Sequence, residues 1–169
     1  MIDKNNGTSD CYGFVSVSLE DMMAIVEEVI REGKSVKLSP RGKSMLPLIR
    51  QKRDSVLLVP ISDEIKKYDI VLYKRENGAY VLHRVVKCDS TYTMLGDNQF
   101  YAERGIERGQ MIAVVKEIYR GQRCVSTDSF LYKTYSRIWI ASAPVRLFML
   151  RLKRKIRRML NKKCTKTSK

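Results

Sequence analysis

The sequence predicts a mainly β, antiparallel domain with one helix before it and an amphipathic basic helix after it. Short runs of β-branched and aromatic residues, separated by turn residues, fill the middle of the 169-residue chain, and such runs are typical of strands. Apolar residues at helical spacing precede this region, and a mixture of apolar and basic residues follows it. A hydrophobic content of 44% is enough for a packed core, so fibrous and disordered classes are excluded.

The first expected element is a helix over residues 18–32. Its apolar residues recur at spacings of three and four: Leu19, Met22, Val26, Val29 and Ile30. Gly33 is a natural residue for the end of a helix. Because such a stripe ordinarily packs against a core, we assign residues 1–33 to a leader and a docking helix.

The middle of the chain is expected to form one antiparallel β domain over residues 34–121. Its predicted strands cover residues 36–39, 55–59, 70–73, 80–86, 92–95 and 111–119. Asn77 and Gly78 lie between the third and fourth of these strands. This dipeptide predicts a tight hairpin turn in which both central residues have positive φ.

Residues 122–169 are expected to be a linker followed by helices. Residues 130–140 are rich in aromatic side chains, and Ala143 and Pro144 can begin a second helix, since proline fits the first helical turn. Apolar and basic residues then alternate from 145 to 160. This pattern predicts an amphipathic cationic helix.

The formal net charge of +15 belongs to this tail. Thirteen of the 33 Lys and Arg residues follow Asp128 and no acidic residue does, which leaves 20 bases and 18 acids before that point. A cationic helix with an apolar face suits an anionic membrane surface, and we expect residues 144–163 to lie on one. A partner-bound or solvated helix is the alternative. Charge alone gives only sequence-independent affinity for nucleic acid, so nucleic acid is not the expected partner.

Targeting and cysteine patterns point to the cytoplasm. The polar residues 1–10 lack the basic and apolar regions of a secretory signal, and no stretch reaches the roughly 18 apolar residues that span a bilayer. The four cysteines are far apart and the chain has one histidine, so we expect no metal site and no cofactor. The expected location is the cytoplasm, with peripheral binding to the inner membrane surface where the tail meets lipid.

Two segments carry residues that neither strand nor helix formation explains. The first is the run GKSMLP at residues 42–47, in which glycine permits an unusual backbone and proline restricts the residue before it, so that Ser44 lies on a fixed turn. The second is the strand at 80–86, whose alternation places His83 on the face of Val81 and Val85. A serine hydroxyl needs a neighbouring base, and a neutral histidine can supply it.

The run at residues 42–47 resembles the G-x-S-M-x-P box of the signal peptidase I family, whose fold is shared with the self-cleaving LexA-type repressors. Three further segments follow in the family's order. Residues 67–73 are similar to its G-D-I-V-x-[FY] strand, residues 83–85 to its base-bearing strand, and residues 95–98 to its G-D-N box. The resemblance covers about residues 34–121 and implies a LexA/signal-peptidase-like β domain.

The resemblance also implies the roles of individual residues. Ser44 corresponds to the nucleophile, and His83 resembles the general base of the Ser–His branch of the family, where most bacterial members have lysine. Asp97 matches the G-D-N aspartate, whereas the acid that orients the histidine in that branch lies a few residues later, where this chain has Glu103. Both acids remain candidates. The Ser44 N–H is the expected oxyanion donor. We assign substrate binding to Gly42, Met45, Pro47 and Arg84.

The expected function is a serine endopeptidase that cleaves a leader or precursor peptide on the cytoplasmic side of the membrane. The peptide would bind in extended form by strand addition. One alternative is a catalytically degenerate peptide-binding or scaffold module, because Glu103 stands where the family has Asp. A LexA-type self-cleaving regulator is disfavoured: residues 1–33 are too short for a helix-turn-helix domain, and neither Ala-Gly nor Cys-Gly occurs in the chain.

Overall fold

The computed structural model describes residues 19–62, 64–146, 148–149, 152 and 155. The elements, in chain order, are α1 (Leu19–Arg31), β1 (Val36–Leu38), β2 (Asp54–Pro60), β3 (Ile70–Lys74), β4 (Tyr80–Cys88), β5 (Tyr92–Leu95), β6 (Glu103–Ile106), the 3-10 helix η1 (Arg108–Gln110), β7 (Met111–Arg120), β8 (Arg123–Ser126) and α2 (Phe130–Ala141). All six predicted strands are present. Two further strands, β6 and β8, were not predicted.

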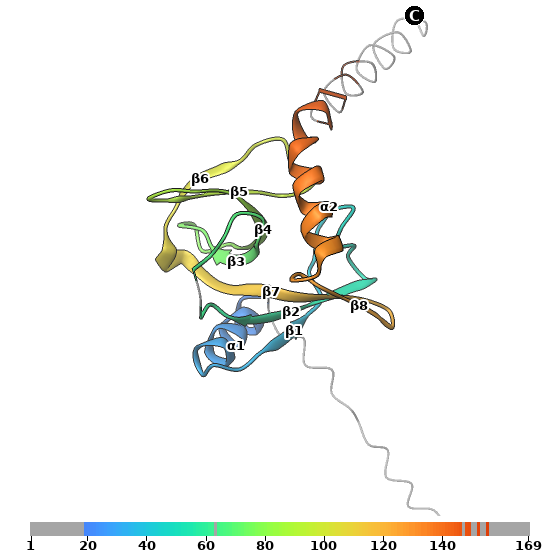
Figure 1. The fold of residues 1–169 in the computed structure, drawn as a ribbon. Helices are drawn as coiled ribbons and strands as arrows, with labels where there is room; N and C mark the ends of the chain where they lie inside the picture. The colour runs from blue at the N-terminus through green and yellow to red at the C-terminus, as the bar shows by residue number, and fades with distance from the viewer. Residues whose placement is uncertain (1–18, 63, 147, 150–151, 153–154, 156–169) are drawn as a thin grey trace, which may run out of the picture.

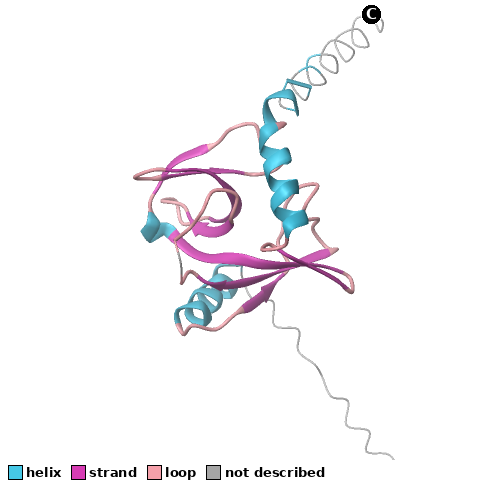
Figure 2. Ribbon diagram, in the orientation of Figure 1, coloured by secondary structure: helices cyan, strands magenta, loops and turns pink. Residues whose placement is uncertain are grey.

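Within the described residues, eight strands form one antiparallel sheet, and the predicted mainly β fold is confirmed. Seven strands follow the order β1-β2-β7-β3-β4-β5-β6, and β8 pairs with β7. The sheet curls so that β3 to β6 lie above β7, while α1 lies beneath β1 and β2 and α2 stands beside the curled strands (Figures 1 and 2). Register shifts in β2, β3, β4 and β5 accompany this curvature.

The two faces of the sheet bury separate cores, as the alternation along β3 shows. Ile70 and Leu72 belong to the core that α1 covers, whereas Val71 and Tyr73 belong to a second core inside the curl. Strand β4 pairs with β3 and alternates in the same way, so successive side chains of β4 point into different cores. This alternation separates the neighbours His83 and Arg84 into two different environments.

Helix α1 packs on the sheet through a face that differs partly from the predicted stripe. Its buried residues are Met23, Val26 and Ile30. Leu19, which was predicted to begin the buried stripe, is 53% exposed. The prediction was wrong there because Leu19 is the first residue of α1, and the buried face of the helix begins one turn later, at Met23.

The hairpin between β3 and β4 forms as expected, but its turn geometry differs. Gly78 has φ of 81°, whereas Asn77 is not among the described residues with positive φ. The Asn77 side chain instead accepts a hydrogen bond from the Ala79 N–H at 3.1 Å. The turn is therefore longer than the two-residue form, because the Arg75 N–H closes it by donating to the Ala79 carbonyl at 2.9 Å.

The region after β7 is more ordered than the predicted linker. Strand β8 occupies residues 123–126 of it, and Ser129 caps α2 by accepting a hydrogen bond from the Tyr132 N–H at 3.3 Å. Residues 143–146 are helical, in agreement with a second helix at Ala143 and Pro144, as are the described residues 148, 149, 152 and 155. The part of the predicted basic helix at 156–160 lies outside the described residues. No helix in the described part of the chain is both long and apolar enough to cross a bilayer.

Candidate active site

Ser44 and His83 line the same cavity, which has a volume of about 230 Å³. Its walls come from the segment between β1 and β2, the start of β4 and the loop after β5. Gly42 and Met45, which the sequence assigned to substrate binding, also line this cavity. Pro47 does not, and it lies instead in a second cavity described below. The fold thus brings together a serine and a histidine that are far apart in the sequence.

A compact turn presents Ser44 to this cavity. The Leu46 N–H donates to the Lys43 carbonyl at 3.3 Å, and the Ile49 N–H donates to the Met45 carbonyl at 2.9 Å. Gly42 has φ of 103°, a conformation that favours glycine. The peptide bond between Leu46 and Pro47 is cis.

The backbone N–H groups of this turn differ in their hydrogen bonding. The Gly42 N–H donates to the Gln51 side-chain oxygen at 3.1 Å and is therefore engaged. Across the described residues no acceptor is found for the Ser44 N–H. The Ser44 N–H is thus available to stabilise a developing oxyanion.

The loop after β5 holds the Ser44 turn from the other side. The Asn98 N–H donates to the Ser44 carbonyl at 2.7 Å, and the Asn98 side chain donates to the Lys43 carbonyl at 3.1 Å. Gly96 allows this close approach, since a Cβ added there would lie 2.9 Å from the Ser44 carbonyl oxygen. The G-D-N box is therefore a clamp that fixes the backbone of Ser44.

His83 is buried beneath the cavity, with 1% of its surface exposed. Its Nδ1 lies 3.1 Å from the Tyr73 hydroxyl and 3.4 Å from Glu103 Oε1. Burial lowers the pKa of His83 from 6.5 to about 4, an effect that the nearby Arg75 adds to and Glu103 opposes. The imidazole is therefore neutral at physiological pH, which is the form that a general base requires.

A chain of polar contacts behind His83 fixes the orientation of its ring. The Tyr73 hydroxyl donates to Glu103 Oε2 at 2.9 Å, and Arg75 donates to both carboxylate oxygens, with the Arg75 Nε–H 2.7 Å from Oε2. Burial alone would raise the pKa of Glu103, but the hydrogen bonds from Arg75 and Tyr73 hold it below its ordinary value. Glu103 is therefore an ionised carboxylate on the Nδ1 side of His83.

These contacts also select one tautomer of His83. The single hydrogen of the Tyr73 hydroxyl is donated to Glu103, so the hydroxyl can only accept at its contact with Nδ1. Nδ1 then carries the proton and Nε2 carries a lone pair. An imidazole in this form can take a proton from a hydroxyl group on its Nε2 side.

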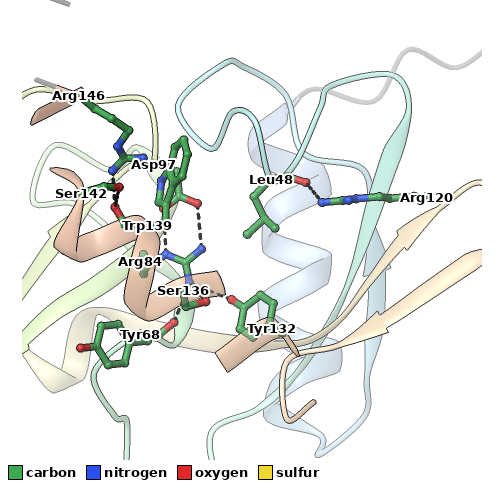
Figure 3. A network of polar contacts seen from close by, with 10 residues as sticks. All are labelled: Leu48, Tyr68, Arg84, Asp97, Arg120, Tyr132, Ser136, Trp139, Ser142 and Arg146. Carbon is green, nitrogen blue, oxygen red and sulfur yellow. Dashed lines mark hydrogen bonds and ion pairs between the residues drawn. The ribbon is translucent and has the colours of Figure 1, made fainter. Parts of the chain in front are cut away.

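Asp97 and Arg84 lie together on the opposite face of β4, away from His83. The Arg84 guanidinium donates to both oxygens of Asp97, at 2.9 and 2.8 Å. It also donates to the Tyr68 carbonyl, the Tyr132 hydroxyl and the Ser136 hydroxyl, at 3.0, 3.0 and 2.9 Å respectively (Figure 3). Both side chains of the ion pair are fully buried.

This placement bears on two expectations from the sequence. Of the two candidate acids, Glu103 contacts the histidine, whereas Asp97 is held by Arg84 on the other face of the strand. Arg84 was assigned to substrate binding, but its side chain is fully buried among protein groups and lines neither cavity. Alternation along β4 explains both results, since His83 and Arg84 point to opposite faces.

Two members of the site, Tyr73 and Arg75, were not predicted from the sequence. Tyr73 lies on the same face of β3 as Val71, which pairs with His83, so alternation and register together could have indicated its position. Arg75 lies in the turn after β3, where no periodic signal applies. In the part of the chain that the structure covers, no three His, Cys, Asp or Glu side chains gather as a metal site.

The curled antiparallel sheet, with the Ser44 turn and the strand that carries His83 at one cavity, is the fold of the LexA/signal peptidase-like superfamily, whose members include serine peptidases. Residues 12–119, more than half of the chain, match the family described as Peptidase S24-like, and the chain belongs to that family. The superfamily resemblance expected from the four sequence boxes is therefore confirmed. No curated protein and no solved structure matches the chain.

Proposed function

We propose that this protein is a serine endopeptidase in which Ser44 is the nucleophile and His83 the general base. The observation that carries the proposal is the shared cavity, which is lined both by a buried neutral histidine and by a serine on a clamped turn. Neutral His83 Nε2 accepts the Ser44 hydroxyl proton as the oxygen attacks the scissile carbonyl, and the imidazolium then protonates the leaving amine. The Ser44 N–H stabilises the oxyanion.

Glu103, Tyr73 and Arg75 act as positioning residues in this mechanism. Tyr73 holds the Nδ1 proton, and the Glu103 carboxylate lies 3.4 Å from Nδ1, where it stabilises the imidazolium that forms. The alternative of a degenerate binding module was motivated by Glu in place of Asp. The extra methylene does not remove the carboxylate from the histidine, so the geometry favours the enzyme over the binding module.

The substrate proposed here is a leader or precursor peptide in extended conformation. The first half of β4, residues 80–83, pairs with β3 on one side, whereas pairing with β5 begins only at Arg84. The other edge of residues 80–83 thus borders the cavity without a strand partner among the described residues. A peptide backbone can pair with such an edge, which would lay the scissile bond across Ser44.

The test uses a proteome-derived peptide library incubated with the full chain, with cleaved termini identified by mass spectrometry. We expect cleavage at a defined set of sites, and loss of at least about 1,000-fold of it in Ser44→Ala and in His83→Ala. Ser90→Ala, which changes an exposed serine between β4 and β5, is the matched control and should cleave normally. Cleavage that survives in Ser44→Ala would show that another residue, or a contaminant, does the chemistry.

We further propose that residues 144–163 hold the enzyme on an anionic membrane surface, with the active site on the cytoplasmic side. Support comes from the absence of acidic residues after Asp128 and from Phe148 and Leu152, which are 65% and 40% exposed and one helical turn apart. Sedimentation with phosphatidylglycerol vesicles should pellet the protein at low salt, and phosphatidylcholine vesicles should not. Phe148→Ser with Leu152→Ser should weaken pelleting. Equal pelleting with both lipids would contradict this location.

A further inference from the structure

A second cavity, of about 390 Å³, lies on the other side of the Ser44 turn. Leu46 and Pro47 form one wall and the loop at 95–99 forms another. The cavity is closed by Trp139, Ala143, Val145, Arg146 and Met149. Gln99 lines both this cavity and the one that contains His83. The two cavities are therefore neighbours, and a bound peptide that passes over Ser44 could reach both.

Arg146 and Trp139, which line the second cavity, carry buried hydrogen-bond donors that have no acceptor among the described residues. Arg146 donates from Nη2 to the Trp139 carbonyl at 2.7 Å, but its Nε and Nη1 are buried without a partner, as is the indole nitrogen of Trp139. The guanidinium lies 3.4 Å from the centre of the Trp139 ring, which fixes its plane. Figure 3 shows Arg146 and Trp139 side by side above Asp97. Unsatisfied buried donors are costly, so their presence in a cavity indicates a ligand that accepts hydrogen bonds.

The electrostatics of the cavity favour a ligand with negative charge. Among the described residues, its lining contains two charged side chains, those of Asp97 and Arg146. Both oxygens of Asp97 are bound by Arg84, so Arg146 supplies the uncompensated charge. Burial lowers the pKa of Arg146, a direction that an acceptor carboxylate would reverse.

We infer that the second cavity binds the part of the substrate on the far side of the scissile bond from the residues that pair with β4. It selects there an apolar side chain next to an acidic one. The apolar side chain fits against Leu46, Pro47 and Leu95, and the carboxylate pairs with Arg146 and the Trp139 N–H. The inference rests on the proposed peptidase function, and it specifies the pair of substrate residues, one apolar and one acidic, that the second cavity binds.

Distance favours a peptide over a lipid as the occupant. Leu46 and Pro47 follow Ser44 by two and three residues, and Gln99 borders both cavities. An extended peptide advances about 3.3 Å per residue, so a chain with its scissile bond at Ser44 reaches the second cavity within a few residues.

Trp139 and Arg146 lie outside residues 12–119, the part that matches the family. The two residues that recognise the carboxylate therefore lie outside the matched family domain.

Trp139 is the one tryptophan of the chain, so its fluorescence reports on this cavity directly. The probes are two acetylated, amidated pentapeptides that share a leucine and differ in the next residue, glutamate in one and glutamine in the other. They are titrated into Ser44→Ala full-length protein, which avoids cleavage. We expect saturable changes in emission and about tenfold tighter binding of the glutamate peptide. Arg146→Gln should remove this preference, and Lys133→Gln, an exposed basic residue of α2, should retain it.

Equal affinity for the two peptides, no saturable change, or an unchanged preference in Arg146→Gln would each overturn the inference. A response to phosphatidylglycerol vesicles but to neither peptide would identify a lipid site and would overturn it as well. Because binding is measured in Ser44→Ala, these outcomes are independent of cleavage. The peptidase proposal fails separately, when library cleavage does not depend on Ser44.

Discussion

His83 combines deep burial with a carboxylate on one side and a cation nearby, and its pKa reflects which effect is larger. Burial lowers that pKa to about 4, Arg75 lowers it further, and Glu103 raises it. The desolvation of the imidazolium therefore outweighs the attraction of Glu103. A base with this pKa is ready at neutral pH without first losing a proton, although a lower basicity reduces its driving force for proton transfer.

This balance predicts the acid limb of the pH–rate profile. For the wild type, kcat/KM should rise with pH through about 4 to 5 and be flat from 6 to 8, because His83 must be neutral. Arg75→Gln removes a positive charge near the ring, so the pKa of His83 should rise and the limb should move to higher pH by roughly one unit. Arg123→Gln, an exposed change on β8, is the control. A wild-type limb at pH 6.5 or above would contradict the buried neutral base.

The same shift predicts a pH dependence of stability. Unfolded His83 binds a proton below about pH 6.5, whereas the folded residue does so only near pH 4. Between these values the unfolded chain holds more protons, so stability falls as pH decreases. From pH 7 to pH 5 this group should remove about 2 kcal/mol from the free energy of unfolding. Urea denaturation of His83→Gln should show a pH dependence smaller by this amount, and an equal dependence in both proteins would exclude the shift.

At the scale of elements, the loop after β5 and the Ser44 turn behave as one unit. Two hydrogen bonds from Asn98 reach the carbonyls of Lys43 and Ser44, and Gly96 lies where a Cβ would meet the Ser44 carbonyl. The position of the nucleophile thus depends on a loop some fifty residues later in the chain. Neither segment is a helix or a strand. The position of the Ser44 backbone therefore depends on the contact between the two segments.

Gly96→Ala should therefore reduce activity while leaving the fold intact. The new Cβ would lie 2.9 Å from the Ser44 oxygen and 3.0 Å from the Gln99 side chain, so the Ser44 backbone must move. A displacement of this kind should lower kcat by roughly 100-fold. Gly109→Ala is the matched control, because no atom lies within 4 Å of its Cβ position. Steady-state kinetics with circular dichroism provide the test, and normal kcat in Gly96→Ala would show that the clamp tolerates the shift.

The sequence predicted elements well where side-chain periodicity is strong and less well where partners determine structure. The six predicted strands are rich in β-branched and aromatic residues. Strand β6, with the sequence ERGI, has one buried residue, Ile106, and exists because β5 offers it an edge. Strand β8 likewise depends on pairing with β7. Such strands are determined by long-range pairing, which local composition does not contain.

The candidate site followed the same rule. Ser44 and His83 stood out through residue type and local context, and the fold places them in one cavity. The choice between Asp97 and Glu103 depended on which acid the fold places on the His83 face of β4. That choice became clear only when β6, the unpredicted strand, placed Glu103 beside Tyr73 and the histidine. Contacts between distant segments have no signature in a single sequence.

At the scale of the whole molecule, β4 connects the active site to the C-terminal helix. One of its faces presents His83 to Glu103, while the next residue, Arg84, reaches Asp97 and the hydroxyl groups of Tyr132 and Ser136 on α2. Asp97 belongs to the loop that clamps Ser44. A single buried guanidinium therefore joins the strand that carries His83, the loop that clamps Ser44 and the helix that lines the second cavity. Because these contacts converge on Arg84, a substitution in α2 should change both the position of Ser44 and the lining of the second cavity.

A double-mutant cycle on Arg84 and Asp97 tests this connection. Asp97→Asn leaves the charge of Arg84 buried without its counterion and should lower the free energy of unfolding by roughly 3–5 kcal/mol. Arg84→Met should cost a similar amount by leaving Asp97 unpaired, whereas the double variant should lose clearly less than the sum, since no buried charge remains. Urea denaturation measures the three differences. The exposed pair of Lys87 and Asp89 is the control, for which the coupling should be small. Additive losses at Arg84 and Asp97 would show that the two side chains act independently, and that α2 and the Ser44 loop are joined by packing alone.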